Sequence, residues 1–213
     1  PSFSRIVAQD AMPANKQTET PEFRAWFGDS KVVDENGKPL RVYHGSGSDI
    51  TTFNTDEGAF FTSSQKSANG YAKNRGGWKI IDDTTGLVVG GTDEFTSRKS
   101  AQEFLDAEVG VAAHVERLAS AVYPVYLSIK NSLEVDAKGA LFGDITFEGS
   151  TIEINDLLVE ASKRGHDGII VRNVRDNGGG DLRIKSDIYA VRDPTQIKSA
   201  VGNRGTFSPT DPD

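Results

Sequence analysis

The sequence predicts an α+β fold in which short antiparallel strands make up most of the sheet. Apolar segments of strand length recur along the 213 residues, and few segments of helical length separate them, which does not suit an alternating β-α-β pattern. The chain has 22 glycines and 8 prolines, so turns are expected to be frequent and helices short. Asn36-Gly37 lies between the apolar segments 32–33 and 40–43 and is the strongest hairpin signal in the chain.

Helices are expected where apolar side chains recur at helical spacing. Thr20 supplies a capping hydroxyl, and Pro21 suits the first turn of a helix. Phe23, Trp26 and Phe27 then form an apolar face that should dock on the core. Further helices are predicted at about 64–74, 98–107, 109–120 and 155–164.

The remaining apolar segments are predicted to be strands. They lie at 32–33, 40–43, 59–61, 78–81, 87–89, 123–129, 133–135, 145–153, 169–171 and 188–192. The hairpin formed by 78–81 and 87–89, with the two helices after it, is interpreted as an insertion over about 75–120. The glycines at 178–180 do not lie between a strand and a helix, so they predict a flexible loop and not a phosphate-binding turn.

One domain is expected over residues 20–205. Residues 1–19 are polar and irregular and should be poorly ordered or act as a linker, and residues 206–213 form a polar tail. Because the chain begins at Pro1 and ends in this polar tail, we interpret it as a domain cut from a longer polypeptide.

The composition limits the classes of function. A net charge of −7 disfavours nucleic acid as the default partner, because phosphate backbones are repelled, although a local basic patch stays compatible with it. The absence of cysteine excludes disulfides, thiolate metal sites and a cysteine nucleophile. His114 is expected as a solvated residue on an insertion helix and His166 as a turn residue, so no metal site is predicted. No apolar run approaches the ~20 residues that span a bilayer, so no membrane partner is expected.

Three short segments carry the candidate chemistry. His44-Gly45-Ser46 ends a predicted strand. Phe60, followed by Phe61, belongs to a Gly-x-aromatic-Phe strand, and ten residues separate Phe60 from Tyr71. Ser67 lies one helical turn before Tyr71, so the two side chains should face the same way. The third segment, Ile188-Tyr189, lies in the last predicted strand.

In this order and spacing the motifs resemble the ADP-ribosyltransferase superfamily of the His-Tyr-Glu type, which includes the diphtheria-like toxins and the poly(ADP-ribose) polymerases. Segments 26–33 and 193–200 further resemble the ADP-ribosyltransferase domains of phage and prophage polyvalent proteins. The resemblance covers roughly 20–205 apart from the insertion. It implies split antiparallel β-sheets around a cleft for NAD, with short flanking helices, the hairpin-helix insertion at the edge and no metal.

The resemblance also implies a role for each motif residue. His44 would hydrogen-bond the adenosine ribose, while the backbone of Gly45 and the hydroxyl of Ser67 would hold the nicotinamide amide. Phe60 and Tyr71 would sandwich the cationic nicotinamide ring, at ~0.5–2 kcal/mol for each ring. For Phe61 core packing is the more ordinary role. The implied NAD-binding set is His44, Gly45, Ser46, Phe60, Phe61, Ser67 and Tyr71.

The third motif departs from the family. The family has Glu directly before the Tyr of the last strand, where this chain has Ile188. Asp187 is next to it, but strand alternation should turn Asp187 away unless a bulge shifts it by one position. Glu57 is a further carboxylate that could approach the cleft. The candidate catalytic set is therefore His44, Phe60, Tyr71, Asp187 and Ile188.

Ile in the third motif is found in the family's mono-transferases, so the resemblance implies transfer of a single ADP-ribose from NAD to a macromolecular target. A protein target is favoured and a nucleic-acid target stays open. The implied setting is a phage or prophage toxin or effector in the bacterial host cytosol, for which an immunity protein is a fitting partner. Two alternatives remain: an NAD glycohydrolase, with water as acceptor, and an NAD or ADP-ribose-binding module with weakened catalysis. An RNA phosphotransferase of related fold is disfavoured, because the arginines it needs are not evident around His44.

Overall fold

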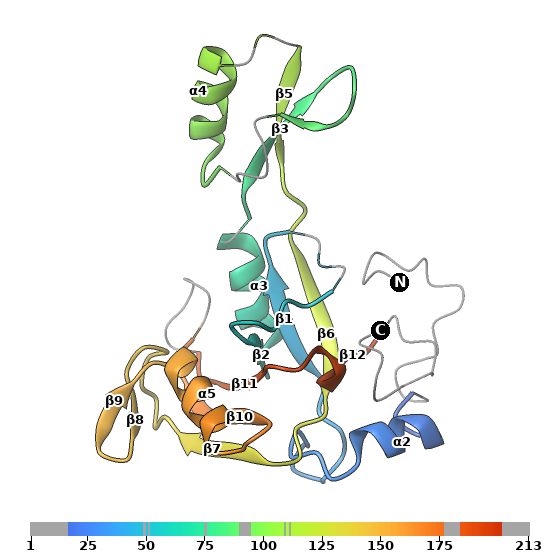
Figure 1. Cartoon of the computed structure of the whole chain (residues 1–213), viewed down its shortest axis with the longest axis vertical. Helices are drawn as coiled ribbons and strands as arrows, with labels where there is room; N and C mark the ends of the chain where they lie inside the picture. The colour runs from blue at the N-terminus through green and yellow to red at the C-terminus, as the bar shows by residue number, and fades with distance from the viewer. Residues whose placement is uncertain are drawn as a thin grey trace.

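The computed structural model describes residues 17–48, 50, 52–74, 76–89, 95–108, 110, 112–176 and 184–201. Its largest feature is a seven-stranded sheet (Figure 1). The strands of this sheet are β1 (Val42–Ser46), β2 (Ala59–Thr62), β6 (Ala121–Leu127), β7 (Ser132–Asp136), β10 (Gly168–Val174), β11 (Ser186–Val191) and β12 (Ile197–Ser199). Their order across the sheet is β12-β6-β1-β2-β11-β10-β7, which confirms the predicted α+β class.

The sheet is divided between β1 and β2. These two strands pair at one position only, Tyr43 with Thr62. In contrast β1 pairs with β6 along its whole length, and β2 pairs with β11 from Ala59 to Thr62. The sheet therefore consists of two well-paired halves, β12-β6-β1 and β2-β11-β10-β7, that meet at one narrow junction.

One strand pair departs from the expected antiparallel arrangement. β10 runs parallel to β7, with Gly168 opposite Ser132. The chain between them forms the hairpin of β8 (Ile145–Phe147) and β9 (Ser150–Ile152) and the helix α5 (Ile154–Lys163). Parallel neighbours need such a crossover, because a short turn can join only antiparallel strands.

Alternating side chains of β10 and β11 enter two different cores. Ile170 and Tyr189 lie in the core shared with β1 and β6, whereas Ile169 and Ile188 lie in the core covered by α5. This follows from the two-residue period of a strand. Each face of the sheet is therefore buried beneath a different layer.

The first predicted helix is confirmed as α2 (Pro21–Phe27). The Thr20 hydroxyl accepts a hydrogen bond from the Phe23 backbone N–H at 3.1 Å, as a helix cap does. Phe23, Trp26 and Phe27 are buried against Tyr126 of β6. This packing attaches α2 to the β12-β6-β1 half of the sheet.

The predicted hairpin at Asn36-Gly37 is only partly formed. The turn is present, because the Gly37 N–H donates to the Asp34 carbonyl at 3.0 Å and Val33 bridges Pro39. From Val42 onward, however, the chain pairs with β6 and not with 32–33. The long strand β6 offers more pairing positions and an apolar face, which the two-residue segment 32–33 does not.

Residues 78–117 form a separate unit that projects beyond α3 (Gln65–Asn74) at one end of the molecule (Figure 1). The predicted hairpin is confirmed as β3 (Trp78–Asp82) and β4 (Val88–Val89), and the predicted helix at 98–107 as α4 (Arg98–Glu108). The predicted helix at 109–120 is wrong. It is replaced by the strand β5 (Ala113–Arg117), which pairs with β3.

Pairing with β3 explains why this segment is a strand and not the predicted helix. Ala113 and Val115 are half-buried, while His114 and Glu116 are exposed, so the segment fits a strand with one covered face. As a strand, this segment forms its backbone hydrogen bonds with the edge of β3. As a helix, it would have formed them within itself and would have stood in solvent. His114 therefore lies on a strand, with its Nδ1 2.5 Å from a carboxylate oxygen of Asp83.

The C-terminal part confirms most of the remaining predicted elements, divides one and adds one. The strand predicted at 145–153 is instead the hairpin of β8 and β9, because the chain turns at Glu148 and Gly149, which both have a positive φ. The strands predicted at 133–135, 169–171 and 188–192 and the helix at 155–164 correspond to β7, β10, β11 and α5. β12, preceded by the short helix η1 (Pro194–Gln196), was not predicted and pairs with β6 at the edge of the sheet. The glycine loop predicted at 178–180 lies outside the described residues.

Candidate active site

A cavity of about 660 Å³ lies where β1 and β2 separate. It is bounded by both strands, the segment after β1, α3, β11 and the residue at the end of the described segment after β10. Six of the seven residues expected to bind NAD line it: His44, Gly45, Ser46, Phe60, Phe61 and Tyr71. A second cavity, of about 410 Å³, borders α2 and α5 and contains none of them.

His44 is held across the junction between the two halves of the sheet. Its Nδ1 donates a hydrogen bond to the carbonyl oxygen of Phe60 at 2.8 Å, which requires the proton to be on Nδ1. The ring also meets Phe53 edge-on at 5.2 Å and Phe61 at 5.7 Å, measured between ring centroids. One residue beyond the single β1–β2 pair, this side chain thus links the strands where their backbones no longer pair.

Gly45 is required by the packing of α3 on β1. A Cβ atom at this position would overlap the carbonyl oxygen of Ala68 and lie 2.9 Å from the Cβ of Tyr71. The missing side chain therefore lets α3 rest directly on the strand and brings Tyr71 to the cavity wall. The sequence suggested a different reason for this glycine, the close approach of a ligand amide. The packing of α3 requires glycine at position 45 whether or not a ligand binds there.

The two candidate rings reach the cavity from different elements and are supported from different sides. Phe60 comes from β2 and meets Phe142 edge-on, with ring centroids 6.0 Å apart. Tyr71 comes from α3, and its hydroxyl donates a hydrogen bond to the carboxylate of Asp176. Both rings border the same cavity as His44.

Ser67 and Phe61 are less accessible than the other predicted residues. Ser67 is 1% exposed and does not line the cavity, although its hydroxyl oxygen is buried without a hydrogen-bond partner among the described residues. Ser67 and Tyr71 lie one helical turn apart on α3, but only Tyr71 lines the cavity. Phe61 reaches the cavity and is otherwise buried with Phe53 and Tyr189 in the core.

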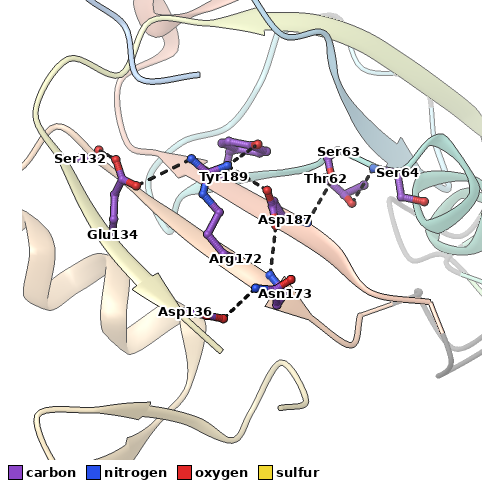
Figure 2. A network of polar contacts seen from close by, with 10 residues as sticks. All are labelled: Thr62, Ser63, Ser64, Ser132, Glu134, Asp136, Arg172, Asn173, Asp187 and Tyr189. Carbon is purple, nitrogen blue, oxygen red and sulfur yellow. Dashed lines mark hydrogen bonds and ion pairs between the residues drawn. The ribbon is translucent and has the colours of Figure 1, made fainter. Parts of the chain in front are cut away.

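Ile188 and Asp187 lie on opposite faces of β11. Ile188 lines the cavity opposite Thr62 of β2 and is 2% exposed. Asp187 points to the other face, where it accepts hydrogen bonds from Nη1 of Arg172 at 2.9 Å and from the N–H of Asn173 at 3.0 Å (Figure 2). The structure does not bring Asp187 to the cavity.

A bulge is present, but it does not rotate Asp187 inward. The register between β10 and β11 shifts between Val171 and Val174. The extra residue is on β10, where Asn173 has a φ of 58° and aims its N–H at Asp187. The irregularity therefore fixes Asp187 on the face of β11 opposite Ile188.

The face of β11 opposite Ile188 carries a polar network whose side chains bond to one another (Figure 2). Arg172 also donates to the hydroxyl of Tyr189 at 3.2 Å and lies 3.7 Å from a carboxylate oxygen of Glu134. Burial raises the pKa of Tyr189 to about 12. Because these residues come from β7, β10 and β11, the network joins three adjacent strands.

Among the described residues, two acids line the cavity. Glu57, considered from the sequence, borders it and is exposed. Asp176 borders it and is 8% exposed, and the sequence reasoning missed it. No motif could have revealed it, because Arg175-Asp176-Asn177-Gly178 has the composition of an ordinary turn.

The fold and this site define an α+β protein with a ligand-sized cavity at the junction of a split sheet. A protein-family model described as ADP-ribosyltransferase in polyvalent proteins matches residues 34–83 and 90–207. The match covers well over half of the chain, so the chain belongs to this family of ADP-ribosyltransferase domains. It includes all three site motifs and most of the projecting unit.

Comparisons with curated proteins and with solved structures gave no match. None of the helices in the described part of the chain combines the length and the apolar character needed to cross a membrane. In the same part of the chain, no three His, Asp or Glu side chains gather as ligands for a metal ion.

Proposed function

We propose that this domain binds NAD in the cavity between β1 and β2 and transfers a single ADP-ribose to a macromolecular acceptor. The observation that carries the proposal is the convergence of His44, Phe60 and Tyr71, from three elements, on one cavity of about 660 Å³. Membership of an ADP-ribosyltransferase family supports NAD as the substrate.

The residues present fit NAD in size and chemistry. Cavities that hold small ligands usually measure about 300–1,000 Å³ and combine aromatic walls with a few polar groups. Here the rings of Phe60 and Tyr71 can face a cationic ring, and His44 and Ser46 supply polar groups. The charged side chains that line the cavity, among the described residues, are the acids Glu57 and Asp176, which favour the positive nicotinamide end.

When bound, NAD supplies a cationic nicotinamide whose bond to the ribose C1′ breaks with its electron pair, while a lone pair of the acceptor forms the new bond to C1′ and the acceptor loses a proton. The chain's residues orient and shield this exchange. His44, held by the Phe60 carbonyl, is set to bond a ribose, and the two rings limit the movement of the nicotinamide. The apolar wall at Ile188 helps to exclude water.

Single transfer follows from the third motif. Ile188 stands where the family's mono-transferases also have Ile, and this resemblance supports the transfer of a single ADP-ribose. The net charge of −7 favours a protein acceptor over a nucleic acid. We further propose a toxin or effector role in the cytosol of a bacterial host, with a phage or prophage as the source. An immunity protein would follow from a toxin role.

The projecting unit is proposed to recognise the acceptor or to act as a lid. Leu87, just before β4, and Val88, within it, are 69% and 47% exposed. Apolar side chains on an edge strand suit contact with another surface. A variant that replaces residues 78–117 with a short linker should keep NAD cleavage and lose transfer to the acceptor.

Biotin-labelled NAD and host lysate provide the direct test. The wild-type domain should label a discrete acceptor, and His44→Ala or Tyr71→Ala should abolish the label because each removes a wall of the cavity. Asp29→Asn, a change at an exposed residue that does not line the cavity, is the control and should label normally. Unchanged labelling by both cavity variants would reject the proposal.

A second candidate is a module that binds NAD or ADP-ribose without turnover. The apolar Ile188 on the cavity wall favours it, since the family's acid is missing there. Calorimetric NAD binding with no release of nicotinamide would select this candidate. Nicotinamide release that does not increase when lysate is added would instead select an NAD glycohydrolase.

A further inference from the structure

The cavity wall contains a buried carboxylate that the family's motifs do not assign. Asp176 is 8% exposed, lines the cavity and accepts a hydrogen bond from the hydroxyl of Tyr71. Asp187 faces the opposite side of the sheet, and Glu57 is exposed to solvent. Of these three acids, Asp176 alone is both buried and on the cavity wall.

The fold holds Asp176 in place from both halves of the sheet. β10 carries the chain to Val174, and the N–H of Arg175 donates to the Ala140 carbonyl at 2.9 Å, which anchors the residue just before Asp176. Tyr71 belongs to α3, which packs on β1 in the other half. The hydrogen bond from Tyr71 to Asp176 therefore crosses from the β1 half of the sheet to the β10 half, beside the cavity.

We propose that Asp176 is a catalytic residue of this site and supplies the carboxylate that Ile188 lacks. The inference rests on the proposed NAD reaction. The Asp176 carboxylate accepts a hydrogen bond from a hydroxyl of the nicotinamide ribose and stabilises positive charge on that side of the substrate. It forms no covalent bond. The proposed acid therefore lies two residues beyond the end of β10 and not within β11.

Several physical features support this role. The carboxylate is one hydrogen bond from the hydroxyl of the ring proposed to face the nicotinamide, so its charge lies beside the cationic part of the substrate. Partial burial strengthens the interaction, because little water screens it. A hydrogen bond to a charged acceptor also contributes more than one to a neutral acceptor.

The charge of Asp176 should make the cavity distinguish NAD⁺ from NADH. The two molecules have nearly the same shape, but only NAD⁺ has a cationic nicotinamide. A nearby carboxylate therefore favours NAD⁺, and a neutral side chain of the same shape does not. This preference is measured by binding alone, independently of catalysis.

Asp176→Asn is the central variant. Asparagine keeps an acceptor for the Tyr71 hydroxyl and nearly the same volume, so the fold should be retained. We expect nicotinamide release to fall on the order of 100-fold. NAD⁺ affinity measured by calorimetry should fall about tenfold, with NADH affinity nearly unchanged. Asp29→Asn makes the same change of charge on an exposed residue and should alter neither affinity nor release.

Tyr71→Phe provides an independent variant if Asp176→Asn folds poorly. It retains the ring and removes the hydroxyl that orients Asp176, so nicotinamide release and the preference for NAD⁺ should both decrease, by less than in Asp176→Asn. Thermal unfolding and circular dichroism verify that each variant is folded.

The outcomes separate the two proposals. If Asp176→Asn releases nicotinamide and prefers NAD⁺ as the wild type does, the role of Asp176 is rejected while the proposed function stands. Equal losses of NAD⁺ and NADH affinity would also reject it, because they would show an effect on cavity shape alone. If the wild type binds no NAD⁺, both proposals fail.

Discussion

The two faces of β11 differ in chemistry although their residues alternate along one strand. The cavity face presents Ile188, an apolar wall without a hydrogen-bonding group. The opposite face presents Asp187 and Tyr189, whose polar groups bond to Arg172. An acid adjacent in sequence to a motif position can thus be unavailable to the site. Its charge is used in joining strands, and the cavity obtains a carboxylate from elsewhere.

The largest effect is expected at the contact that forms the cavity face. Gly45→Ala would place a Cβ against the backbone of Ala68, so α3 must move and take Tyr71 with it. We expect a loss of about 3 kcal/mol in the free energy of unfolding. Urea denaturation measures this, and calorimetry should show weaker NAD binding.

Gly143→Ala is the matched control for this change, because a Cβ there would meet open space. Its free energy of unfolding should stay within about 0.5 kcal/mol of the wild type. If Gly45→Ala behaved like Gly143→Ala, α3 would not need the glycine, and its role would revert to contact with a ligand.

The next largest effect on stability is expected from Arg172, on the side of β11 that carries Asp187 and Tyr189. Arg172→Ala leaves the buried Tyr189 hydroxyl and the Asp187 carboxylate without their shared donor. A loss of about 2–3 kcal/mol in stability is expected, while NAD affinity of the folded protein stays unchanged. Arg98→Ala, at an exposed position of α4, serves as control. Weaker NAD binding with normal stability would show that the two faces are not independent.

The pKa of Tyr189 provides a prediction about pH. Burial raises this pKa from 10.0 to about 12, so the folded state holds the proton more tightly than the unfolded state. The stabilisation is complete below pH 10 and is lost as the pH rises from about 10 to 12, by about 2 kcal/mol. Tyr189→Phe should lose less stability across this window in chemical denaturation. If Tyr189→Phe and the wild type lost the same stability, a group other than Tyr189 would be responsible for the pH dependence.

The smallest effect is expected from Asp187→Asn. Asparagine still accepts from the Asn173 N–H but loses its charge beside Arg172, so stability should fall by about 1 kcal/mol. NAD binding and nicotinamide release should match the wild type, in contrast to Asp176→Asn. If Asp187→Asn lost nicotinamide release and Asp176→Asn did not, Asp187 would be the catalytic acid and Asp176 would not.

Most elements could be predicted from local pattern. The capped helix at Pro21, the helix at 64–74 and the strand at 59–61 were evident because their apolar spacing and turn residues depend on a few neighbouring residues. The helix expected at 109–120 was wrong, because that segment became a strand on the free edge of β3. Short-range propensity could not anticipate a partner strand whose paired residues lie 31–39 positions away in the sequence.

The candidate site, too, has features that depend on local sequence and features that depend on tertiary contacts. By itself, the sequence determined the spacing of Phe60 and Tyr71, the apolar residue at 188 and, through the two-residue period of a strand, the outward direction of Asp187. Only the tertiary structure decided that Ser67 stays beneath the cavity wall, that Gly45 accommodates α3 and that Asp176 meets Tyr71 across the split sheet. The first group depends on backbone geometry within one element. The second depends on contacts between residues far apart in the chain, which form only when the two halves of the sheet pack together.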